Sequence, residues 1–168
     1  MTDLESIDLD FVPLGDTGLQ TSELQFGTWR FGKETEEGSV EIGEQRAHEL
    51  LDAYESAGGR FIDTADVYGG GQSEEWIGEW LADRDRERFT IASKIFWQIR
   101  EGDPNSRGTN RKNVRHRMAK ILERLDTDYV DILYIHRWDD DTPTREMMKT
   151  LNGLVEDGMV HYLGASTL

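Results

Sequence analysis

The sequence predicts an α/β fold in which a parallel sheet forms part of a barrel, and three observations support this prediction. Short apolar runs alternate with segments of helical periodicity at roughly 30 residues per unit, which is typical of parallel strands joined by crossover helices. The turn after the first strand, Gly27–Gly32, lacks the G-x-G-x-x-G pattern of a dinucleotide-binding, doubly wound sheet. Polar residues follow each later strand, as expected where the carboxyl ends of barrel strands converge.

The chain is expected to form one domain over residues 1–168, with its βα units in residues 24–168. We expect residues 1–10 to be disordered and residues 11–22 to form a hairpin around the Gly15–Gly18 turn. The acidic segment 34–44 is expected to be a solvated loop.

Five strands and four helices are expected to alternate after the hairpin. The expected strands are residues 24–27, 61–62, 89–93, 129–135 and 160–165. Apolar residues at helical spacing mark the helices over residues 47–57, 76–81, 114–125 and 147–155. The expected N-caps are Ser73, Asn110 and Thr142, and Pro143 is expected at the first helical position.

The composition excludes several classes of partner. The chain has 34 acidic and 19 basic side chains and a net charge of −15, so it should bind neither a nucleic-acid backbone nor an anionic membrane surface. No stretch approaches the roughly 20 apolar residues of a membrane span, and the N-terminus lacks the pattern of a targeting signal. The absence of cysteine excludes disulfides and thiolate metal sites, and we expect no metal. These features favour a cytoplasmic protein.

The acidic residues are dispersed along the chain, and only five of the basic residues are lysines. A dispersed, arginine-biased acidic surface favours adaptation to high salt, since short screening lengths tolerate self-repulsion. An ordinary acidic protein is the alternative. The only basic cluster (Arg111, Lys112, Arg115 and Arg117) is interpreted as a solvated helix face, and Gly69–Gly71 is interpreted as a flexible loop tip.

Four polar residues at or after the strand ends have complementary chemistry. A tyrosine hydroxyl, with a pKa of about 10, becomes a better proton donor beside an ammonium group, and Lys94 can supply that charge to Tyr68. Asp63 would neutralise the buried ammonium, and His136 would donate a hydrogen bond to a substrate carbonyl or help to move the proton. The group therefore suits protonation of an oxyanion formed at a carbonyl.

In order along the chain, the sequence resembles the motifs of the aldo-keto reductase family at residues 61–69 (FIDTADVYG), 92–94 (ASK), 124–131 (RLDTDYVD), 135–137 (IHR) and 162–167 (YLGAST). Residues 14–19 (LGDTGL) are similar to the opening hairpin of its long-chain bacterial and potassium-channel β-subunit branches. The resemblance covers residues 11–168. It implies an incomplete (β/α)8 TIM barrel, because a closed barrel needs about 250 residues.

By this resemblance Asp63, Tyr68, Lys94 and His136 match the family's catalytic tetrad, with Tyr68 as the general acid. The implied reaction is NADP(H)-dependent reduction of an aldehyde or ketone, with NADPH as cofactor and NADH as the alternative. Ser166 matches the residue that binds the nicotinamide carboxamide, and Thr167 stands where many members have Asn. The strands that carry the family's nicotinamide-stacking aromatic residue and its phosphate-binding residues lie outside the five expected here.

Trp29, Trp97 and Trp138 lie at or just beyond strand ends, where they are expected to form an apolar wall for a small carbonyl substrate; rim packing is the alternative. A non-catalytic nucleotide-sensing or regulatory subunit and an inactive fragment are the alternative functions. Unpaired edge strands predict self-association or pairing with a complementing C-terminal half. The candidates for side chains filling the barrel interior are Phe26, Ile62, Ile91 and Leu133.

Overall fold

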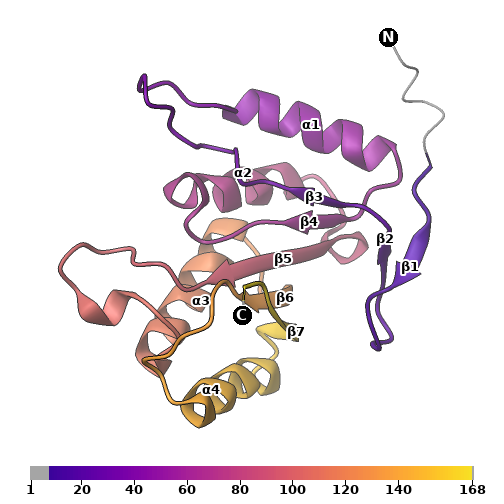
Figure 1. Ribbon diagram of the computed structural model, residues 1–168. Coiled ribbons are helices and arrows are strands. Elements are labelled where there is room, and N and C mark those ends of the chain that lie inside the picture. Colours follow the sequence, from indigo (N-terminus) through magenta and orange to yellow (C-terminus); the bar gives the residue numbers. More distant parts are fainter. Residues whose placement is uncertain (1–7, 168) are drawn as a thin grey trace.

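The computed structural model describes residues 8–167, in which a five-stranded parallel sheet is lined by four α-helices (Figure 1). The strands lie in sequence order, and each pairs in parallel with the next. They are β3 (Gln25–Gly27), β4 (Phe61–Asp63), β5 (Thr90–Ile95), β6 (Val130–Ile135) and β7 (Val160–Ala165). This sheet agrees with the α/β fold predicted from the alternation of apolar runs and helical segments.

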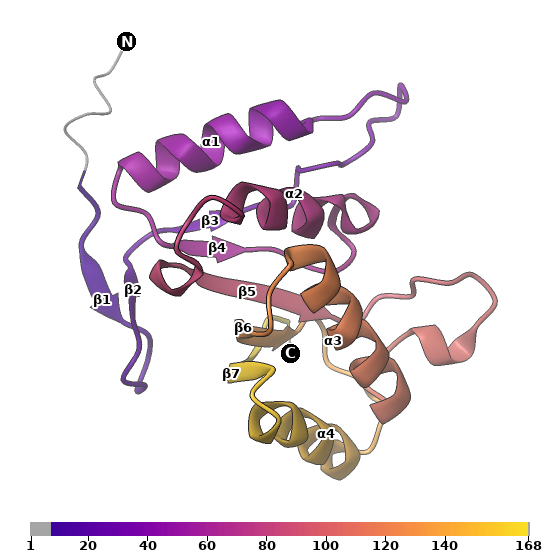
Figure 2. The same ribbon diagram turned by 180° about the vertical axis from the view of Figure 1, so that it is seen from behind.

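A separate antiparallel hairpin of β1 (Phe11–Pro13) and β2 (Gln20–Ser22) precedes the sheet. It lies at the end of the sheet away from the long loop that follows β5 (Figures 1 and 2). The expected disorder of residues 1–7 lies outside the described residues. Residues 8–10, which were also expected to be disordered, instead pack on the structure: the Leu9 amide donates to the Ala57 carbonyl over 3.0 Å.

The four α-helices each follow a strand of the sheet and pack on one another in order. They are α1 (Glu44–Ser56), α2 (Gln72–Leu81), α3 (Arg111–Leu125) and α4 (Thr144–Glu156), and short 3-10 helices occupy Tyr68–Gly71, Arg86–Arg88 and Pro104–Ser106. Gly78 permits the close contact of α2 with α3, because a Cβ at this position would lie 2.5 Å from the Arg124 carbonyl oxygen. None of these helices has both the length and the hydropathy that a membrane span requires.

The helix starts agree with the expected caps at one position of three. The Asn110 side chain accepts a hydrogen bond from the Asn113 amide, as an N-cap should. At α2 the N-cap is Gly71 rather than Ser73, and the buried Ser73 hydroxyl instead bonds to the side chains of Thr28 and Thr64. At α4 the N-cap is Pro143, without a side-chain bond, so the expected Thr142 cap was also wrong.

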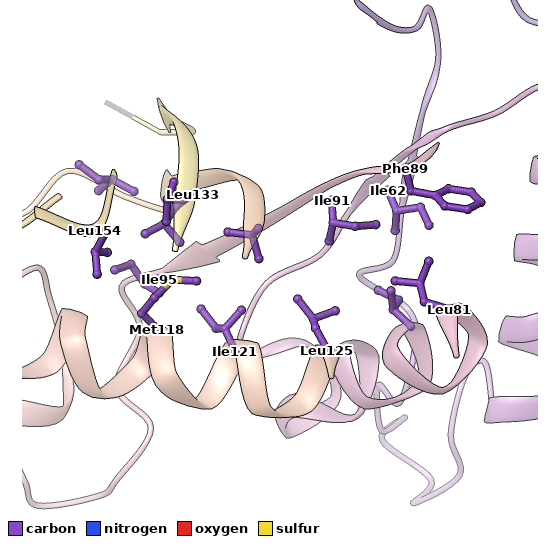
Figure 3. Close-up of a cluster of buried hydrophobic side chains, with 14 of the residues drawn as sticks. Ile62, Leu81, Phe89, Ile91, Ile95, Met118, Ile121, Leu125, Leu133 and Leu154 are labelled. Carbon is purple, nitrogen blue, oxygen red and sulfur yellow. The ribbon is translucent and has the colours of Figure 1, made fainter. Parts of the chain in front are cut away.

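The main core lies between the sheet and the helices (Figure 3). Ile62, Ile91 and Leu133 of successive strands face this core, opposite Ile121 and Leu125 of α3. These three side chains, together with Phe26, were candidates for the barrel interior, with their direction left open by the sequence, and all four instead belong to or pack against the main core. Successive side chains of a strand point to opposite faces, so an error of one residue reverses the face.

The opposite face of the sheet carries a smaller apolar cluster of Phe61, Ala92 and Ile132, with Tyr134 and Tyr162 packed against it. By the period of two along each strand, this is also the face of Asp63 and Lys94. The inner face of the sheet therefore carries apolar residues in its middle and polar residues at its carboxyl edge.

Candidate active site

An ion pair joins the carboxyl ends of β4 and β5. The Lys94 Nζ donates to Asp63 Oδ2 over 2.6 Å and to the Thr64 carbonyl over 2.8 Å. Lys94 is 6% exposed, so its charge needs these acceptors. The Asp63–Lys94 pairing expected from the strand ends is present, and it holds the ammonium group at a defined place on the inner face.

Tyr68 lies in the loop after β4, where the ammonium group of Lys94 is 5.2 Å from the centre of its ring. The loop is tied to the strand of Lys94 because the Asp66 amide donates to the Lys94 carbonyl over 3.2 Å. Gly69 supports the tight turn that follows: its φ is +58°, and a Cβ there would lie 2.6 Å from the Phe31 carbonyl oxygen.

The pKa of Tyr68 is raised, first by burial and second by the Asp63 carboxylate. We expected Lys94 to lower this pKa. The expectation fails because Asp63 neutralises the ammonium and burial disfavours the phenolate. The phenol therefore keeps its proton at neutral pH in the unliganded site.

His136 follows β6 and completes the group. Its ring centre is 5.9 Å from that of Tyr68, with an interplanar angle of 78°, and 6.1 Å from that of Trp97. Burial, with the positive charges of Lys94 and Arg117 as further causes, lowers the pKa of His136 from 6.5 to about 4. The imidazole is therefore neutral near pH 7 and can donate one hydrogen bond from a ring nitrogen.

We expect His136 to titrate near pH 4 rather than 6.5 in an NMR titration of its ring Cε1–H signal. Its folded pKa is the lower one, so the unfolded chain binds more protons between these values. The contribution of His136 to stability is therefore present above pH 6.5 and is lost as the pH falls through about 4. A midpoint at or above 6.5 would show that the ring is solvated.

The three tryptophans surround the mouth of this site. Trp29 and Trp97 line a cleft of about 530 Å³ together with Tyr68 and His136. Trp97 also lines a second hollow of about 380 Å³, together with Trp138 and His136. All three indoles are between 38% and 54% exposed, so they offer apolar surface to a ligand rather than filling the core.

Ser166 and Thr167 follow β7 at the same edge of the sheet. The Ser166 amide donates to the Ile135 carbonyl over 2.9 Å, and the Thr167 carbonyl accepts from the Trp138 amide over 2.9 Å. Both side chains are exposed, and Thr167 lines the hollow of about 380 Å³. Thr167 therefore lies beside His136 in this hollow, whereas Ser166 does not line it.

Two buried ion pairs behind the site were missed in the sequence. Arg117 was assigned to a solvated face, but it is 1% exposed and its guanidinium binds Asp66, which is 4% exposed. Arg124 pairs in the same way with the buried Glu74. The helical period indicates that Arg117 is on the buried face of its helix, since it lies three residues after Val114 and four before Ile121, both of which are buried.

Comparisons with known proteins agree with this geometry. The sequence model of the Aldo/keto reductase family matches residues 23–168. An aryl-alcohol dehydrogenase from Pestalotiopsis microspora is 40% identical over 153 residues, covering 88% of this chain and 40% of the relative. A probable voltage-gated potassium channel subunit beta from Oryza sativa subsp. japonica is 35% identical over 161 residues, covering 94% of this chain and 46% of the relative.

Among solved structures, the holo form of the aldo-keto reductase AKR11C1 from Bacillus halodurans is similar, with a TM-score of 0.80 and 27% identity. The match covers 95% of this chain and 51% of that chain. The chain thus spans less than half the length of the two sequence relatives and about half of the solved one. The comparisons confirm the predicted family resemblance and the partial barrel.

Proposed function

The chain belongs to the aldo/keto reductase family, and from this we propose that it carries the proton-transferring site of an NADP(H)-dependent oxidoreductase that reduces an aldehyde or ketone. One observation carries the proposal: Asp63, Lys94, Tyr68 and His136 come from three different βα units and meet beside one cleft. The roles of these residues follow from their contacts.

Tyr68 is the proposed general acid. A carbonyl oxygen in the cleft accepts hydrogen bonds from the Tyr68 hydroxyl and the neutral His136 ring, and the bound cofactor supplies the hydride that reduces the carbonyl carbon. As negative charge develops on the oxygen, Tyr68 transfers its proton and leaves a phenolate. The Lys94 ammonium stabilises that phenolate, and Asp63 holds the ammonium in place.

Ser166 and Thr167 are proposed to hold the nicotinamide carboxamide through their exposed hydroxyl groups. We propose NADPH as the cofactor, with NADH as the alternative. By the family resemblance, residues that hold the pyrophosphate and the adenosine belong to later barrel strands. The match to about half of a holo aldo-keto reductase structure supports a shared cofactor site completed by further strands.

The proposed substrate is a small aromatic or apolar carbonyl compound. Three partly exposed indoles can pack against such a ring on either side of His136. The similarity to a protein named as an aryl-alcohol dehydrogenase supports this substrate class.

A second candidate is a non-catalytic, nucleotide-sensing or regulatory subunit, which the similarity to a probable potassium channel β subunit favours. A measurement of turnover distinguishes the enzyme from the non-catalytic subunit. With the remaining barrel strands supplied, oxidation of NADPH on addition of an aromatic aldehyde, lost in Tyr68→Phe and kept in Tyr162→Phe, supports the enzyme. Nucleotide binding without turnover supports the subunit, and neither property is expected of an inactive fragment.

The charge pattern supports a protein that works in a cytoplasm of high salt. We expect the thermal midpoint to rise from about 0.1 M to 3 M potassium chloride, because screening relieves the repulsion among 34 acidic side chains. Calorimetry over this range measures the trend. A flat or falling midpoint would indicate an ordinary acidic protein.

A further inference from the structure

Arg117 connects two segments that border the cleft. From the middle of α3, its Nε donates to the Asp66 carboxylate and its Nη1 donates to the main-chain carbonyl of Trp97. Asp66 belongs to the loop of Tyr68, and Trp97 begins the long loop after β5. One buried guanidinium therefore links the loop that carries Tyr68 to the loop that carries Trp97.

The Trp97 loop borders a cavity as well as the cleft. Beneath it lies a cavity of about 290 Å³, lined by Gln98 and Ile99 of the loop and by Arg117. The loop leaves the sheet at Phe96, whose carbonyl accepts from the Gly108 amide over 2.7 Å. The Trp97 ring contacts the rings of Phe96 and His136, whereas the hydrogen bond from Arg117 holds its main-chain carbonyl.

The Tyr68 loop, in contrast, is held without Arg117. The Asp66 amide donates to the Lys94 carbonyl, and the Tyr68 amide donates to the Ala65 carbonyl over 3.0 Å. Asp66 is thus a fixed anchor for Arg117. Loss of the two guanidinium hydrogen bonds should therefore free the main chain of Trp97 and leave the Tyr68 backbone in place.

We propose that Arg117 is a positioning residue that holds Trp97 against His136 at the mouth of the cleft. For its effect on catalysis the inference rests on the proposed function. Lysine cannot replace arginine here, because one ammonium on a flexible stem does not reproduce the planar fork that reaches both Asp66 and Trp97.

The test uses the 168-residue chain labelled with 5-fluorotryptophan, whose five ¹⁹F signals are assigned by single Trp→Phe variants. In Arg117→Lys we expect the Trp97 signal to shift or broaden while those of Trp76 and Trp80 stay unchanged. The matched control is Arg124→Lys, which alters the neighbouring buried ion pair on the same helix and should leave Trp97 unchanged.

An unchanged Trp97 signal in a folded Arg117→Lys chain, or an equal change in the Arg124→Lys control, would overturn the proposal. If Arg117→Lys does not fold, the double variant Asp66→Asn, Arg117→Gln gives the same test. This double variant replaces the ion pair with a neutral pair, and the glutamine side chain is too short to reach the Trp97 carbonyl.

Kinetics give a second, separate readout. In the chain complemented by the remaining barrel strands, and with an aromatic aldehyde as substrate, we expect Arg117→Lys to raise KM by up to about tenfold, the value of one aromatic contact, with kcat little changed. A fall in kcat of the same size, with KM unchanged, would contradict a role in substrate positioning. If the chain mixed with a polypeptide that supplies the remaining barrel strands shows no turnover, the proposed function fails, whereas the fluorine signals still decide whether Arg117 positions Trp97.

Discussion

Replacing Tyr68 by Phe is expected to lower kcat for carbonyl reduction by about 10²- to 10⁴-fold, the usual contribution of a general acid. The variant removes only the hydroxyl that is proposed to protonate the substrate oxygen. The ring stays beside Lys94 and His136, so the cleft keeps its shape. Nucleotide affinity should therefore change little, because the phenol acts on the substrate rather than on the cofactor.

Steady-state NADPH oxidation and fluorescence titration of NADPH measure the two effects in the chain complemented by the remaining barrel strands. The matched control is Tyr162→Phe, which removes a hydroxyl from the same inner face but not from the cleft. Turnover of Tyr68→Phe equal to that of the wild type would rule out Tyr68 as the acid. Loss of nucleotide binding in the same variant would show that Tyr68 holds the cofactor instead.

The position of the tetrad was predictable because it depends on topology alone. Parallel strands bring their carboxyl ends to one edge, so residues that follow separate strands, such as Asp63 and His136, had to lie near one another. The tryptophans at the cleft mouth were predictable for the same reason. Each of them follows a strand end along the chain.

The features that were missed depend on side-chain direction. Ile62 and Ile91 were only candidates for the barrel interior, because a strand of three to six residues gives too few positions to fix its alternation. Arg117 was assigned to solvent because a charged residue is rarely buried unless it is paired, and its partner Asp66 lies 51 residues earlier in the chain. The lowered pKa of His136 likewise depends on burial that only the folded chain creates.

Residues 1–168 alone are expected to bind NADPH weakly and to self-associate, whereas addition of a polypeptide with the remaining barrel strands should restore cofactor binding and turnover together. The sheet shows why. The central strand β5 is buried at all six positions, whereas five of the six residues of the edge strand β7 are exposed or half-exposed beside unpaired backbone groups. Such an edge binds another strand readily.

The complementing polypeptide is the corresponding C-terminal segment of a relative, such as the aryl-alcohol dehydrogenase that this chain covers to 40%. Light scattering at high salt should show the self-associated chain converting to a 1:1 complex, and NADPH fluorescence should show binding only in the mixture. The same mixture made with Tyr68→Phe separates the two functions, since it should regain binding without turnover. A compact monomer of the chain alone that binds NADPH at micromolar concentration would show that the five strands already form a sufficient site, because binding would then not depend on covering β3 and β7.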